Sequence, residues 1–147
     1  MLRIRKMTEE DLDQVTDIAA ELFAMPWNRE GFEESLLMDN ACFLVAEDEG
    51  RIAGYCGLFM ALDEGEVINV AVRRKCQRKG IANRLFQALL DAGRQNGVSR
   101  FFLEVRVSNE AAIRLYEKNG FARQGIRRNF YKMPREDAYV MNRIEER

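Results

Sequence analysis

The chain has 147 residues, and its 23 lysines and arginines nearly balance its 24 aspartates and glutamates, which excludes a strong overall attraction to nucleic acid or anionic membranes. The length fits one domain, residues 1–147, whose core needs no disulfide or structural metal. Because there are three cysteines at wide spacings and no histidine, the usual Cys/His zinc patterns are excluded and we expect no metal.

The amino-terminal third is expected to form a strand and two helices. Residues 2–7 alternate apolar and basic side chains, as in a short edge strand. The apolar positions that follow recur at helical spacing, and this helix should end before Pro26. Asn28 can cap a second helix that runs through Met38. Trp27 lies in the elbow between the two helices, where it either packs or lines the mouth of a substrate groove; we favour packing.

The middle of the chain is expected to form an antiparallel meander that leads into a long helix. Residues 42–47 and 51–61 have strand character, and turn residues follow each of them. From residue 67 to residue 72 the apolar side chains are small or β-branched and nearly continuous, which predicts a strand buried on both faces. From Ala82 onward they recur at helical spacing, so the strand leads into a helix.

A charged glycine turn, residues 77–82, connects this strand to the helix. Gly80 lets the backbone approach a ligand closely, and the first turn of a helix has N–H groups without intrahelical partners. Such a turn favours anions. It matches neither the Walker pattern nor the dinucleotide-binding glycine pattern, which indicates a different phosphate ligand. An ordinary basic surface turn is the alternative.

The carboxyl-terminal third is expected to add a strand, a helix and a closing pair of strands. The first strand spans residues 101–107, and the helix begins at Asn109 and ends near Asn119. Residues 121–128 and 137–144 have strand character. The irregular segment between these last two strands is a candidate functional loop.

The turn sequence Gln-Arg-Lys-Gly-Ile-Ala at residues 77–82 resembles the Gln/Arg-x-x-Gly-x-Gly/Ala signature of the GNAT superfamily of N-acetyltransferases. The expected order of strands and helices is also similar to that of this superfamily. The resemblance implies an α/β, single-domain GNAT fold with a mixed central sheet of about seven strands flanked by about four helices. It also implies that acetyl-CoA binds the backbone of the strand and the turn at Val70, Ala71, Val72, Arg78, Lys79, Gly80, Ile81, Ala82 and Asn83.

Acetyl transfer from a thioester to an amine needs a base for the amine, donors for the oxyanion and an acid for the departing thiolate. Because there is no histidine, a carboxylate is the candidate base. Glu104 stands inside an apolar strand, where an acid is disfavoured without a purpose. The alternative is a Glu104 that faces solvent or pairs with Arg106 on the same face. Tyr116, on the following helix, has a phenol suited to protonating the thiolate, but tyrosines at such positions are often simply core.

Residues 103–121, LEVRVSNEAAIRLYEKNGF, resemble a segment of the bacterial ribosomal-protein-alanine N-acetyltransferases. The resemblance implies that Glu104 is the proton acceptor, Tyr116 the proton donor and Asn109 a contact of acetyl-CoA; Asn109 also fits a helix cap. Pro-Trp at 26–27 and IRRNFY at 126–131 resemble two further segments of these enzymes. We therefore expect Trp27 and Tyr131 to bind the acceptor.

The resemblance implies an enzyme that acetylates the α-amino group of an N-terminal alanine on a small-subunit ribosomal protein, the eighteenth. Lys132-Met133-Pro134 replaces a more glycine-rich connection of these enzymes, a departure that bears on which acceptors are accepted. The alternatives are an acetyltransferase for a small amine or a lysine side chain, and a noncatalytic acyl-CoA-binding module. The sequence has no apolar run of about 18 residues and no signal-peptide core, so we expect a cytoplasmic protein, and we favour a monomer.

Overall fold

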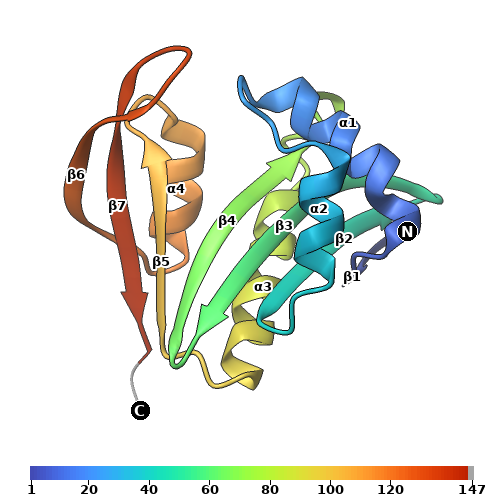
Figure 1. Ribbon diagram of the computed structural model, residues 1–147, viewed down its shortest axis with the longest axis horizontal. Coiled ribbons are helices and arrows are strands. Elements are labelled where there is room, and N and C mark those ends of the chain that lie inside the picture. The colour runs from blue at the N-terminus through green and yellow to red at the C-terminus, as the bar shows by residue number, and fades with distance from the viewer. Residues whose placement is uncertain (146–147) are drawn as a thin grey trace.

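The computed structural model describes residues 1–145 as a mixed sheet with helices on both faces (Figure 1). The strand order is β1-β2-β3-β4-β5-β7-β6. The strands are β1 (Leu2–Lys6), β2 (Ala41–Asp48), β3 (Arg51–Ala61), β4 (Glu64–Val72), β5 (Arg100–Arg106), β6 (Ala122–Tyr131) and β7 (Glu136–Ile144). The helices are η1 (Glu9–Asp11), α1 (Leu12–Leu22), α2 (Arg29–Leu36), η2 (Arg74–Cys76), α3 (Ile81–Gln95) and α4 (Glu110–Lys118), where η marks a 3-10 turn. Over this part of the chain, the expected α/β fold of seven strands and four α-helices is confirmed.

The centre of the sheet is interrupted between β4 and β5. These strands are parallel, and they pair only over Glu64–Glu66 and Arg100–Phe102. Beyond Glu66 they diverge, and Figure 1 shows them separating toward their carboxyl-terminal ends. A register shift between Cys56 and Leu58 of β3 gives β4 one extra residue close to this point. Backbone groups of β4 beyond Glu66 are therefore not paired to β5.

Two apolar clusters cover the two faces of the sheet. On one face α3 and α4 pack over the strands, with Leu85 and Leu89 of α3 completely buried. On the other face α1 and α2 do so, through residues such as Ile18 and Phe32. Residues three or four apart share one side of a helix, which is why the sequence periodicity predicted these buried faces. Within residues 1–145 no helix is long and apolar enough to span a bilayer.

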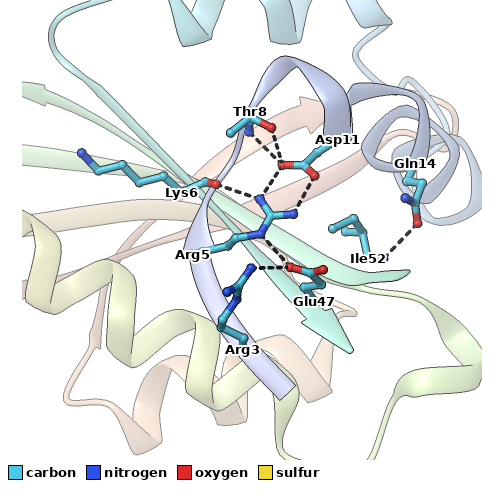
Figure 2. A network of polar contacts seen from close by, with 8 residues as sticks. All are labelled: Arg3, Arg5, Lys6, Thr8, Asp11, Gln14, Glu47 and Ile52. Atoms are coloured by element: carbon cyan, nitrogen blue, oxygen red, sulfur yellow. Dashed lines mark hydrogen bonds and ion pairs between the residues drawn. The ribbon is translucent and has the colours of Figure 1, made fainter. Parts of the chain in front are cut away.

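An ion-pair network joins β1 to the first helical segment and to β2 (Figure 2). The Arg5 guanidinium donates to the two carboxylate oxygens of Asp11 at 2.8 and 2.9 Å, and its Nε donates to Glu47 at 2.8 Å. The Asp11 carboxylate also accepts a hydrogen bond from the Thr8 backbone at 2.8 Å. The Arg5 bonds are the main reason that the pKa of Asp11 lies below its ordinary value. The buried charge of Asp11 therefore depends on Arg5.

Three expectations about the elements are corrected. The strand expected at residues 67–72 is not buried on both faces, because residues 68–70 are half-exposed where β5 diverges. It begins earlier, at Glu64, because the preceding turn lies at residues 62–63. The irregular segment before β7 is shorter than expected, because β6 continues to Tyr131 and there pairs with Glu136.

Candidate active site

A cavity of about 730 Å³ opens where β4 and β5 diverge. Its walls come from residues 66–70 of β4, residues 104–106 of β5, the connection between α1 and α2, the start and middle of α4, and the β6–β7 hairpin. The expected site residues that line it are Trp27, Val70, Glu104, Asn109, Tyr116 and Tyr131. Residues far apart in the sequence thus meet at one place.

Glu104 lines the cavity from β5. Alternation along the strand buries Leu103 and Val105 in the core and leaves Glu104 on the opposite face. Its side chain is 14% exposed, and Oε2 lies 3.6 Å from Nε of Arg127 in β6. The alternative pairing with Arg106 is wrong, since Arg106 bonds to the β6–β7 hairpin. A mostly buried carboxylate beside a cavity can accept a proton from an amine that enters it.

Tyr116 lines the same cavity from α4, and its ring belongs to the core. The ring centroids of Phe86 and Phe121 lie 5.2 and 6.2 Å from that of Tyr116. Burial raises the pKa of Tyr116 well above its ordinary value, and the phenol of Tyr131 acts in the same direction. The hydroxyl therefore stays protonated at neutral pH, as a proton donor must. Being a core residue does not exclude a catalytic role here.

Two further aromatic residues form walls of the cavity. Trp27 packs against Phe32 and Phe59, with ring centroids 5.3 and 6.2 Å from its own, and it also lines the cavity. The Arg106 guanidinium carbon lies 4.4 Å from the centroid of the Tyr131 ring. Burial, followed by the negative charge of Glu104, raises the pKa of Tyr131 to about 12. Acceptor binding by Trp27 and Tyr131 stays a prediction.

Arg106 anchors the hairpin that carries Tyr131. Its Nη1 donates to the Pro134 carbonyl at 2.9 Å and to the Glu136 carboxylate at 3.1 Å. Its Nη2 donates to the Lys132 carbonyl at 3.1 Å. These bonds fasten the loop between β6 and β7 to the end of β5. One wall of the cavity is therefore set by a side chain of the strand that also carries Glu104.

The glycine turn at the start of α3 has the properties expected of a phosphate-binding turn. Gly80 has a φ of +79°, which favours glycine, and a Cβ placed there would have no atom within 4 Å. Gly80 is also the N-cap of a 15-residue helix and offers no side chain to its first-turn N–H groups. Arg78 and Lys79 are exposed beside it. These features suit a phosphate group, and its binding at this turn stays a prediction.

The other residues expected to bind acetyl-CoA present different groups to it, some only their backbone and some a side chain. Residues 70–72 pair with β3 on one edge, and the divergence of β5 leaves the other edge unpaired by that strand. Ala71 and Val72 have buried side chains, so only their backbones are available. Asn109 caps α4 by accepting from the Ala112 N–H at 3.2 Å and also lines the cavity. The Asn83 side chain accepts from Asn119 at 3.0 Å, which links α3 to the end of α4.

Comparison with known proteins identifies the family. Residues 12–121 match the acetyltransferase (GNAT) family. The chain belongs to this family. A ribosomal protein bS18-alanine N-acetyltransferase of Escherichia coli is 35% identical over 143 residues, 96% of each chain. A Bacillus subtilis protein, described as a candidate ribosomal protein bS18-alanine N-acetyltransferase, is 37% identical over 139 residues, which cover 94% of this chain and 92% of the Bacillus subtilis protein. The crystal structure of the Escherichia coli enzyme matches with a TM-score of 0.91 and 33% identity, covering 100% of this chain and 96% of the other.

Membership of the GNAT family confirms the acetyltransferase fold and activity, and it makes acetyl-CoA the cosubstrate. The Gly80 turn and the open edge of β4 fit a molecule that has a pyrophosphate and a long extended arm. Among residues 1–145 no cluster of three or more His, Cys, Asp or Glu side chains is placed to hold a metal.

The sequence did not predict that Glu66 and Tyr55 line the cavity or that Arg127 pairs with Glu104. A hydroxyl within the otherwise apolar run of β3 is a signal that could have drawn attention to Tyr55. Nothing local indicates that β5 leaves β4 just after Glu66 or that β6 brings Arg127 to Glu104.

Proposed function

We propose that this GNAT enzyme transfers the acetyl group of acetyl-CoA to the α-amino group of the N-terminal alanine of ribosomal protein bS18. The observation that carries the proposal is one cavity lined by both Glu104 and Tyr116, beside the open edge of β4. It is supported by near full-length similarity to enzymes named for this reaction. Its place of action is the cytoplasm, where ribosomal proteins are made.

In this proposal Glu104 is the general base. Bound acetyl-CoA supplies the thioester, and Glu104 accepts a proton from the acceptor ammonium, directly or through water. An α-ammonium has an ordinary pKa of about 7.7 to 8.0, against about 10.4 for lysine, so a carboxylate removes its proton more readily near neutral pH. Nε of Arg127 lies 3.6 Å from Oε2 of Glu104, which also lines the cavity that the acceptor amine enters.

Tyr116 is the general acid. Its hydroxyl donates a proton to the departing sulfur, and burial keeps that proton on the phenol until it is needed. The amine attacks the thioester directly, so no residue of the chain is acylated. Tyr116 lies on α4, whose first turn is capped by Asn109, and this places the donor and a proposed acetyl-CoA contact on one short rigid element.

The acceptor peptide is proposed to lie between the Trp27 side and the Tyr131 side of the cavity. The β6–β7 hairpin, which Arg106 fastens through Lys132 and Pro134, bounds this groove. Because this loop departs from the more glycine-rich connection of related enzymes, it is the part of the site where acceptor range is expected to differ. The acetyl chemistry does not depend on it.

The test compares two peptides with the purified protein and acetyl-CoA. One begins with the free alanine of bS18; the other has a blocked amino terminus and a free internal lysine. We expect mass spectrometry to place the acetyl group on the alanine of the first peptide and to find the second unmodified. Acetylation mainly of the lysine, or turnover only with polyamines, would replace this proposal by the lysine or small-amine activity. No turnover with any amine would favour the noncatalytic module.

A further inference from the structure

A second carboxylate, Glu66, lies at the closed end of the divergence between β4 and β5. It is the last β4 residue in register with β5, opposite Phe102, and on its other side it is opposite Phe59 of β3. Residues opposite one another in a sheet share a face, and Phe102 and Glu104 share a face by alternation. Glu66 and Glu104 therefore lie on the same face of neighbouring strands, and both line the cavity.

Glu66 is half-buried but has no cation of its own. Within residues 1–145 its side chain forms no hydrogen bond or ion pair, whereas the Glu104 carboxylate has Arg127 at 3.6 Å. Burial and then the negative charge of Glu104 raise the pKa of Glu66, and Arg127 opposes this only in part. Glu66 and Glu104 thus share the guanidinium of Arg127, while Arg106, which also lines the cavity, is paired with Glu136. A cation that enters the cavity would be attracted to the two carboxylates.

A buried polar group in the same cavity independently indicates a place for a polar ligand group. Tyr55 is 1% exposed and lines the cavity, and its hydroxyl has no hydrogen-bond partner among the described residues. Asn69 is close enough to lower the pKa of Tyr55 somewhat, but the two side chains do not meet in hydrogen-bond geometry, and burial raises the pKa far more. Buried hydroxyls are normally paired, so this one is suited to an incoming polar group.

We propose that Glu66 is an acceptor-binding residue that holds the protonated amine of the acceptor beside Glu104. The inference rests on the proposed function, since it concerns how that acceptor amine is recognised. Glu66 attracts the ammonium form, and Glu104 then takes the proton; Glu66 forms no bond with the acetyl group. Because an ammonium held by Glu66 is not easier to deprotonate, the contribution is to binding rather than to the rate of transfer.

The test measures how much an acceptor charge contributes to binding. The affinity of an alanine-led peptide and of the same peptide acetylated at its amino terminus is measured by calorimetry in the presence of CoA, for the wild type and for Glu66→Gln. Glu64→Gln is the matched control, because Glu64 is exposed on the same face of β4 and does not line the cavity. Circular dichroism checks the fold of each variant.

We expect the wild type and Glu64→Gln to prefer the free-amine peptide, and Glu66→Gln to lose about fivefold to tenfold of that preference, between the values typical of exposed and of buried ion pairs. In steady-state assays, KM for the peptide should rise by a similar factor while kcat stays near that of the wild type. Glu66→Asp should recover part of the preference because it restores the charge.

Two results would overturn the inference. One is an unchanged preference in Glu66→Gln; the other is a wild type that binds the free-amine and acetylated peptides equally. A failure of the proposed function is distinct, because the protein would then keep its preference for a free amine but place no acetyl group on the alanine.

Discussion

Replacing Tyr116 with phenylalanine should greatly slow catalysis and leave the protein folded. The aromatic ring packs against Phe86 and Phe121, at centroid distances of 5.2 and 6.2 Å, and phenylalanine preserves these contacts. We therefore expect the free energy of unfolding to change by less than about 1 kcal/mol, because only a hydroxyl is lost. A positioned acid typically contributes about 10² to 10⁴-fold, so kcat should fall by that factor, equivalent to about 2.7 to 5.4 kcal/mol in the barrier.

The pH dependence separates an acid from a base. Burial raises the pKa of Tyr116 above its ordinary value of 10, so the phenol stays protonated, and its donor role is lost only as the pH rises through that higher value. Over roughly pH 6 to 9 the defect of Tyr116→Phe should thus be nearly constant, since alkaline solution cannot supply a proton to the thiolate.

The assay is kcat against pH, with acetyl-CoA affinity and circular dichroism measured on the same samples. Tyr139→Phe is the matched control, because Tyr139 lies on β7, stacks with Arg123 at 4.4 Å and does not line the cavity. This variant should keep nearly full activity. Normal turnover in Tyr116→Phe, or recovery of its activity at high pH, would show that another group protonates the thiolate.

Three more predictions concern the base, the phosphate turn and the acid stability of the fold. Glu104→Gln should lower kcat by about 10² to 10⁴-fold at neutral pH and recover part of it in alkaline solution, where the free amine forms without a base; near-normal turnover would assign that role to water. Gly80→Val and Gly97→Val should each lower the free energy of unfolding by roughly 1 to 2 kcal/mol, because both glycines have positive φ in open space at the two ends of α3. Acetyl-CoA affinity, measured by calorimetry, should fall only in Gly80→Val. Equal affinities in the two variants would show that the turn is not part of the site. Asp11→Asn should lower the free energy of unfolding, measured by urea titration at neutral pH, by about 3 kcal/mol. The pKa of Asp11 is lowered by folding, so this stabilisation is present above its ordinary value of 3.8 and is lost as the pH falls through the folded value; a loss independent of pH would contradict the Arg5 pairing.

The sequence by itself determined the local features of the site. The change from strand to helical period around Gly80 predicted the turn, and the structure places Gly80 at the N-cap of α3 with a positive φ. Asn28 and Asn109 cap their helices as expected, each accepting a backbone N–H. Alternation in β5 separated Glu104 from its buried neighbours. These features depend on residues close together in the chain, so period and capping chemistry are enough to predict them.

Only the tertiary structure decided which charges meet. Arg106 was the natural partner for Glu104 by spacing, but the hairpin places carbonyls and Glu136 around Arg106, and β6 brings Arg127 to Glu104. Similarly, Glu66 became a cavity residue because β5 leaves β4 immediately after it. Strand register, the extra residue of β4 near Glu66 and packing on both faces of the sheet bring together residues that no local period relates.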